Sequence, residues 1–120
     1  MSAEVRSRRL QRGIAVPFKG HDATFSVQEI QARLKPVFAN HKIRKAILFG
    51  SYGKGTATKQ SDVDLLVDSN LHGLKFVGFV EKLRDALGGK DMDVFDVSHV
   101  EPQSRIEEEI RQTGIEIYAE

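Results

Sequence analysis

The sequence predicts a single small α/β (α+β) domain, in which helices pack on one mixed β-sheet. Three observations support this fold class. Helical and strand periodicities alternate along the chain, 120 residues suffice for one compact core, and 40% of the residues are hydrophobic while 29% are charged. Cysteine is absent, which excludes disulfides, zinc–thiolate sites and cysteine nucleophiles. Because we find no signal peptide and no apolar run of roughly 20 residues, we expect a cytoplasmic protein without a membrane partner.

The charge of the chain is balanced overall but not along its length. The formal net charge is +1, which by itself does not indicate a nucleic-acid partner. Residues 1–20 contain five basic side chains and one acidic one, whereas residues 101–120 contain six glutamates and two arginines. We therefore predict a basic N-terminal arm over residues 1–25, flexible or partly helical, and a folded domain over residues 26–120.

The elements of this domain are expected in the order helix, strand, loop, strand, helix, strand, helix, strand. The helices are expected over residues 26–39, over residues 74–87, and between Pro102 and Gly114. The strands are expected over residues 43–49, 62–68, 91–97 and 115–118. The loop covers residues 51–60 and has room for one helical turn.

Local signals justify the elements of the first half. Ser26 and Glu29 form a capping box ahead of an apolar stripe at helical spacing, which begins the first helix. The apolar run of the first strand stops at Gly50, as a buried strand does. Along residues 62–68, apolar side chains fill one face and mostly aspartates the other, which is typical of a strand with two different surroundings.

The second half is justified in the same way. A broad apolar face runs through the second helix, which two consecutive glycines end. Pro102 suits a first helical turn, Ile106 and Ile110 form the inward face of the last helix, and Gly114 closes it. The acidic run Glu107–Glu109 is expected on the solvated face of this helix.

Two carboxylates stand together at the start of the second strand. Asp62 and Asp64 share one face, about 6–7 Å apart along the chain. Hard oxygen ligands of this kind select Mg²⁺ or Mn²⁺, and two such ions can activate an attacking oxygen and hold a polyphosphate. The spacing alone is weak evidence, because it recurs at Asp91 and Asp93.

The loop before these carboxylates strengthens the case for a phosphate ligand. Gly50 and Ser51 follow a buried strand directly, so backbone N–H groups and a hydroxyl are available to phosphate oxygens, while Lys54 and Lys59 can neutralise charge. A Walker A loop is excluded, because Thr56 stands where that motif requires lysine. The dinucleotide fingerprint is excluded as well, because its third glycine is missing.

The combined motif resembles that of a known family. The Gly-Ser pair at 50–51, ten intervening residues and the Asp-Val-Asp triplet at 62–64 are similar to the signature of the DNA polymerase β-like nucleotidyltransferase superfamily. Residues 46–55 and 61–67 resemble its minimal nucleotidyltransferase branch, and the likeness extends over about residues 26–118. The resemblance implies a polymerase β-like nucleotidyltransferase fold.

The resemblance also implies a reaction. Members of the superfamily bind two divalent ions through three carboxylates and transfer a nucleoside monophosphate from a nucleoside triphosphate, releasing pyrophosphate. Asp62 and Asp64 match the first two carboxylates, and Asp93 is the best match for the third and the candidate base for an acceptor hydroxyl. Asp91 sits at the strand entrance, and Asp96 points to the opposite face. AMP from ATP is the expected group, with Mg²⁺ or Mn²⁺ as the cofactor.

The nucleotide would be held, by the same resemblance, at Gly50, Ser51, Lys54 and Ser61. The branch often has Ala-Arg-Gly after Gly-Ser-Tyr, whereas this chain has Gly53-Lys54-Gly55. Lysine keeps the charge but loses the bidentate fork of arginine, and the extra glycine is expected to loosen the loop.

Larger relatives add a second domain that recognises the acceptor, so here acceptor recognition is expected to come from a homodimer or from another chain, or to be absent. Minimal nucleotidyltransferases are commonly paired with a helical HEPN-domain toxin, and some adenylylate a tyrosine of that toxin. Two alternatives stay open: a module that neutralises a partner by docking alone, and an enzyme that modifies nucleic-acid ends with the help of the basic arm over residues 1–25. Tyr52 either stacks on a base or acceptor, or packs beside the loop.

Overall fold

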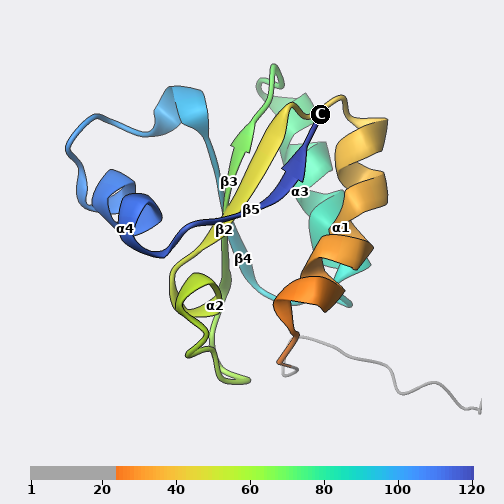
Figure 1. Ribbon diagram of the computed structural model, residues 1–120. Helices are drawn as coiled ribbons and strands as arrows, with labels where there is room; N and C mark the ends of the chain where they lie inside the picture. Colours follow the sequence, from red (N-terminus) through yellow and green to blue (C-terminus); the bar gives the residue numbers. More distant parts are fainter. Residues whose placement is uncertain (1–23) are drawn as a thin grey trace, which may run out of the picture.

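The computed structural model describes residues 24–120 (Figure 1). The helices are α1 (Val27–Asn40), α2 (Ser51–Lys54), α3 (Leu74–Ala86) and α4 (Arg105–Thr113), with a 3₁₀ turn η1 (Val97–His99). The strands are β2 (Lys45–Phe49), β3 (Val63–Asp68), β4 (Met92–Asp96) and β5 (Ile115–Ala119). The basic arm predicted over residues 1–25 lies outside the described residues except for its last two, and Phe25 is buried in the core.

The four strands form one mixed sheet in the order β4-β3-β2-β5. Strand β2 is antiparallel to both β3 and β5, whereas β3 and β4 are parallel. The α/β fold class with a small mixed sheet is therefore confirmed. The crossover from β3 through α3 to β4 supplies the parallel pair, as a βαβ unit does. This pairing brings the first residues of β3 beside those of β4.

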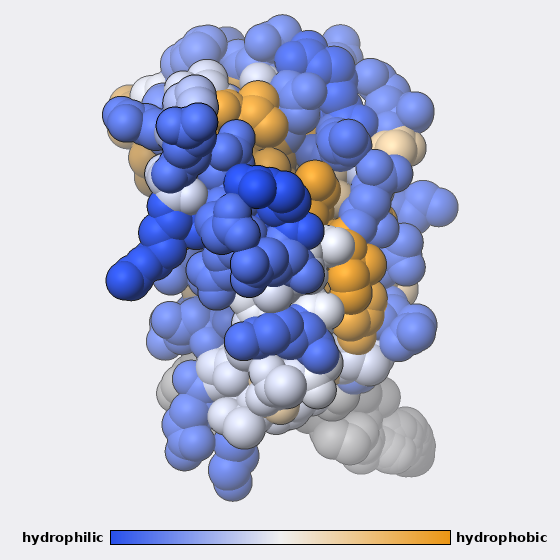
Figure 2. Space-filling model, turned by 60° about the vertical axis from the view of Figure 1, so that its left-hand side comes forward, coloured by the Kyte–Doolittle hydropathy of each residue, from blue (hydrophilic) through white to orange (hydrophobic). Residues whose placement is uncertain are grey.

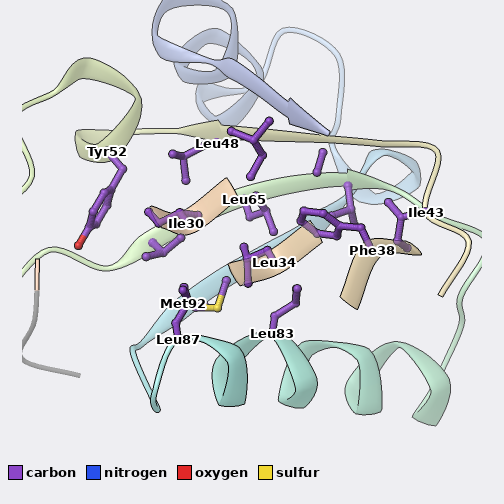
Figure 3. Packing of buried hydrophobic residues seen from close by; sticks show 14 of the residues in the cluster. Ile30, Leu34, Phe38, Ile43, Leu48, Tyr52, Leu65, Leu83, Leu87 and Met92 are labelled. Carbon is purple, nitrogen blue, oxygen red and sulfur yellow. The ribbon is translucent and has the colours of Figure 1, made fainter. Parts of the chain in front are cut away.

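The sheet lies between two helical layers: α1 and α3 cover one face, and α4 lies on the other (Figure 1). Strand β3 explains the division, because Val63, Leu65 and Val67 are fully buried while the alternate residues are only half-buried. Figure 3 shows Leu65 of β3 packed with side chains of α1 and α3, among them Leu34 and Leu83. Burial of this kind stabilises the fold by about 25 cal/mol per Å² of apolar surface. The aspartates of β3 consequently face the α4 side of the sheet.

The caps of the helices decide where they begin. Around α1 the capping box is present, since the Glu29 backbone N–H donates to Ser26 Oγ at 3.0 Å and the Ser26 N–H donates to Glu29 Oε1 at 2.9 Å. The predicted start of the last helix near Pro102 is wrong. Ser104 caps α4 by accepting a hydrogen bond from the Glu107 N–H at 3.2 Å, so the helix begins only after this serine.

Within residues 24–120, every helix is too short or too polar to cross a membrane. The single helical turn for which the 51–60 loop had room is present as α2, which begins directly after Gly50. The glycine after it, Gly55, adopts the left-handed conformation (φ +80°) and ends the turn. The segment between β2 and β3 is thus a short helix followed by a loop.

Candidate active site

Three aspartates lie on the α4 side of the sheet, where β3 and β4 begin. Asp64 of β3 and Asp93 of β4 are direct neighbours in the parallel register, on strands that run about 4.8 Å apart. Asp62 precedes β3 by one residue and is exposed, as is Asp93, whereas Asp64 is half-buried. Asp96 lies three residues beyond Asp93, on the opposite face, as its position in the strand predicts.

Asp64 is the carboxylate whose ionisation is most disturbed. Burial raises its pKa first, and the negative charges of Asp93, Glu109 and Asp62 raise it further, to about 6. A carboxylate with this surplus of negative charge around it attracts a cation or a proton donor. The sequence indicated Asp62 and Asp93 as neighbours of Asp64, but not Glu109.

A glycine turn lies under the carboxylate of Asp64. Gly50 is buried and has φ +74°, a conformation that glycine adopts without strain. A Cβ atom at Gly50 would collide with Asp64 Oδ2, so the missing side chain lets the carboxylate lie directly over the turn. The Gly50 N–H donates to Thr113 Oγ1 at 2.8 Å, so this donor is already engaged. Ser51, half-buried at the start of α2, is the next candidate for a phosphate contact.

The last helix contributes residues that sequence reasoning missed. A pocket of about 380 Å³ lies between α2 and α4. Its lining residues are Lys54, Arg105, Glu108, Glu109, Gln112 and Thr113. Neither Lys54 nor Arg105 forms an ion pair with another residue of the 24–120 segment, so both positive charges are available to an anion. Figure 2, which brings the α4 side forward, shows this side as mostly hydrophilic with a strip of apolar residues along it.

The expectation that Glu107–Glu109 is a solvated run therefore needs correction at one position. Glu107 and Glu108 form ion pairs with Arg111 at 3.8 and 2.8 Å, as exposed helical neighbours do. Glu109, half-buried like Glu107, instead raises the pKa of Asp64. Its spacing of four from Thr113 places both on one side of α4, but only the docking of that helix reveals which side faces the site.

Glycine at position 53 has a packing role. A Cβ atom at Gly53 would collide with the main-chain oxygen of Thr113, so only glycine lets α2 approach the end of α4 this closely. We expected this glycine to loosen the loop; it lies instead at a tight joint between two helices.

The remaining predicted residues shape the loop between α2 and β3. Ser61 Oγ accepts a hydrogen bond from the Thr58 N–H at 2.9 Å, which holds the tip of the loop. Lys90, which is almost completely buried, donates from Nζ to the Lys59 carbonyl at 3.1 Å. Tyr52 is buried at one end of the hydrophobic core (Figure 3), so it packs beside the loop and is not free to stack on a base.

The donor chemistry of the aspartates fits a hard divalent cation. The described part of the chain contains no ready-made cluster of three or more Asp, Glu or His side chains that could enclose a metal ion. Mg²⁺ usually binds through one or two carboxylates together with the phosphate oxygens of a substrate, and not in an all-protein cage. Asp64 and Asp93, adjacent in register, meet that weaker requirement.

Comparison with known proteins identifies the family. The family model described as "Polymerase beta, Nucleotidyltransferase" matches residues 32–120. The chain belongs to this family. It is therefore a nucleotidyltransferase, as the Gly-Ser and Asp-Val-Asp motifs led us to expect.

A curated relative of this nucleotidyltransferase is "Putative protein adenylyltransferase MJ0435" of Methanocaldococcus jannaschii. The two are 29% identical over 79 residues, which cover 64% of this chain and 84% of the relative. A crystal structure of a toxin–antitoxin with AMP-PNP matches with a TM-score of 0.62 at 23% identity, covering 75% of this chain and 73% of that one. The toxin–antitoxin MntA-HpeT, in a mutant with two Asp-to-Glu substitutions, matches with a TM-score of 0.61 at 21% identity and the same coverage. At these identities the two structures establish the fold.

Proposed function

We propose that this nucleotidyltransferase transfers AMP from ATP to a hydroxyl group of a partner protein, with Mg²⁺ or Mn²⁺ as the cofactor and pyrophosphate as the second product. The observation that carries the proposal is the position of Asp64 and Asp93, side by side on parallel strands, with Asp64 over the Gly50 turn. The choice of AMP and of a protein acceptor is supported by the relative named as a protein adenylyltransferase. A cytoplasmic location stays a prediction.

Asp62, Asp64 and Asp93 would bind the divalent ions together with the triphosphate. When bound, the ions supply positive charge to the reacting phosphate and to the departing pyrophosphate. The raised pKa of Asp64 supports this role, because a bound cation offsets both the burial and the neighbouring negative charges that raise it. The Asp93 carboxylate, exposed at the rim, would take the proton from the acceptor hydroxyl.

The phosphate tail would lie between α2 and α4. Ser51 would donate its backbone N–H and hydroxyl to phosphate oxygens, while Lys54 and Arg105 would neutralise their charge from the two sides of the pocket. Gly50 would contribute the conformation of the turn and not a hydrogen bond to phosphate, because its N–H already donates to Thr113 Oγ1. Ser61 would act by holding the loop tip, through its bond to the Thr58 N–H.

A toxin–antitoxin partner is the most specific form of the proposal. Its support is the fold shared with two toxin–antitoxin structures, one of them containing an ATP analogue. A second support is the mutant with Asp-to-Glu substitutions at two positions two residues apart, which is the spacing of Asp62 and Asp64 here. We propose a small helical HEPN-like toxin as the partner and acceptor. The alternative partner is a second copy of this chain, and the alternative acceptor is a nucleic-acid end.

The test is label transfer to the product of the neighbouring gene. The purified pair is incubated with Mg²⁺ and either [α-³²P]ATP or [γ-³²P]ATP, and the proteins are separated by electrophoresis. We expect label on the partner from the α-labelled nucleotide alone, because AMP and not phosphate is transferred. Asp64→Asn should abolish it, whereas Asp91→Asn, on an exposed aspartate at the start of the same strand pair, should not.

Each other outcome overturns a defined part of the proposal. Equal label with wild type and Asp64→Asn would exclude catalysis at this site. An Asp64→Asn protein that still neutralises the partner, with no label in the wild type, would favour docking alone. Label on added RNA or DNA, lost on deletion of residues 1–20, would replace the protein acceptor by a nucleic-acid end. EDTA should remove all transfer, and Mg²⁺ or Mn²⁺ should restore it.

A further inference from the structure

The hydroxyl of Thr113 connects the last helix to the turn under Asp64. Thr113 Oγ1 accepts the Gly50 N–H at 2.8 Å and donates its own proton to the Glu109 carbonyl at 2.7 Å. A hydroxyl has one proton and two lone pairs, so the Thr113 hydroxyl acts here both as a hydrogen-bond donor and as an acceptor. The two partners are separated by about half of the chain, and the hydroxyl joins them.

A threonine hydroxyl that donates to the carbonyl four residues earlier is common in helices and needs no functional role. The bond to Gly50 is different, because it crosses 63 residues of sequence and ends on a buried backbone N–H. If the hydroxyl were removed, that N–H would lose its partner inside the protein. The structure also packs the main-chain oxygen of Thr113 against the α-carbon of Gly53, so residue 113 touches both ends of the Gly50–Gly53 segment.

The orientation of the Gly50 amide sets the position of Ser51, the next residue in the chain. Gly50 has φ +74°, and its α-carbon lies under Asp64 Oδ2. Rotation of this peptide would move the Ser51 N–H and hydroxyl relative to the aspartates. The bond to Thr113 opposes that rotation.

We infer that Thr113 is a positioning residue, which holds the Gly50–Ser51 turn in the geometry that binds the triphosphate. The inference rests on the proposed function, since it presumes that Ser51 binds phosphate. It assigns to α4 a role in nucleotide binding that is independent of any charge on that helix.

The experiment compares Thr113→Val, which keeps the shape without hydrogen bonds, with Thr113→Ser, which keeps the hydroxyl. Arg111→Val is the matched control: it puts the same β-branched residue into the same last turn of α4, at an exposed position outside the pocket. The first measurement is amide hydrogen exchange of Gly50 by NMR on the nucleotide-free protein. The second is KM for ATP and kcat in the transfer reaction, and the third is Tm.

We expect Thr113→Val to accelerate exchange at Gly50 and to raise KM for ATP, each about 3- to 10-fold, with kcat changed less than KM. Thr113→Ser should restore both values, and Arg111→Val should lower Tm without moving either. If Thr113→Val behaves as Arg111→Val does, the inference is overturned. If exchange accelerates while KM does not change, the bond is structural only and the inference fails.

The design separates this inference from the proposed function. If Thr113→Val does not fold, Thr113→Ala removes the same hydroxyl with a smaller side chain, and its exchange rate at Gly50 and its KM for ATP decide by the same criteria. If the wild type neither binds ATP nor transfers AMP, the proposed function fails, and the triphosphate part of the inference fails with it. If the wild type is active and Thr113→Val matches it, only the inference fails.

Discussion

Replacing Asp64 by asparagine should stabilise the metal-free protein at pH 8. In the folded chain burial and the charges of Asp93, Glu109 and Asp62 raise the pKa of Asp64 from its ordinary 3.8 to about 6. Above pH 6 the ionised carboxylate therefore opposes folding. At 1.36 kcal/mol per pKa unit the full shift corresponds to about 3 kcal/mol. Asp64 is half-exposed, so solvent screening reduces this to about 1.5 kcal/mol.

The sign determines how the effect depends on pH. Between pH 3.8 and about 6 the folded state binds more protons at Asp64 than the unfolded state does, so wild-type stability falls as pH rises through this range. Asparagine has no charge and avoids this loss. Asp64→Asn should therefore become more stable than the wild type as the pH rises from 4 to 7. Above pH 7 the difference in their free energies of unfolding should stay constant.

The assay is urea unfolding followed by far-UV circular dichroism in EDTA, at pH 4.5 and pH 8. The matched control is Asp91→Asn, since Asp91 is exposed beside the same strand pair. A difference for Asp64→Asn that is the same at both pH values would contradict the raised pKa as its cause. A pH-dependent gain of the same size in Asp91→Asn would contradict it too, because it would trace the effect to general surface charge.

Three other substitutions test the structure. Arg105→Ala should weaken ATP binding about tenfold and leave AMP binding unchanged. Arg111→Ala, at an exposed position that does not line the pocket, should change neither, and isothermal titration measures both. Burial alone would raise the pKa of Asp96, but four hydrogen bonds from serines lower it, so Asp96→Ala should lower the free energy of unfolding by about 3 kcal/mol at pH 7. Chemical unfolding should show this difference shrinking in acid, as the wild-type carboxylate takes up its proton. Gly53→Ala should lower Tm by several degrees through collision with the Thr113 carbonyl, and an unchanged Tm would contradict the tight joint.

The sheet and its inner face were predictable because their signals are local. Alternation along residues 62–68 predicted which side chains of β3 point inward, and Val63, Leu65 and Val67 are buried as that pattern requires. The same parity argument placed Asp93 and Asp96 on opposite faces of β4. In a strand of five or six residues, an apolar face decides which side chains point toward the core and which point away from it.

The contribution of α4 could not be predicted, because it depends on how the helix docks. Glu107, Glu108 and Glu109 are alike in sequence, yet two of them pair with an arginine and only the third acts on Asp64. The bond from Gly50 to Thr113 joins positions 63 residues apart, and no local pattern specifies it. We expected Gly53 to make the loop less rigid, because the residue that it contacts, Thr113, lies in a distant part of the sequence.

These contacts give α4 two tasks that depend on each other. The helix leads through Gly114 into β5, the edge strand paired with β2, and a Cβ at Gly114 would meet the Ile110 carbonyl at 2.5 Å and Ile47 Cγ2 at 2.9 Å. The close contact of Gly114 with Ile47 of β2 therefore also positions the Thr113 hydroxyl to accept the Gly50 N–H. Loosening the contact between Gly114 and Ile47 should therefore weaken nucleotide binding before it unfolds the core, because this contact lies on the α4 face of the sheet, whereas the core lies on the other face, under α1 and α3.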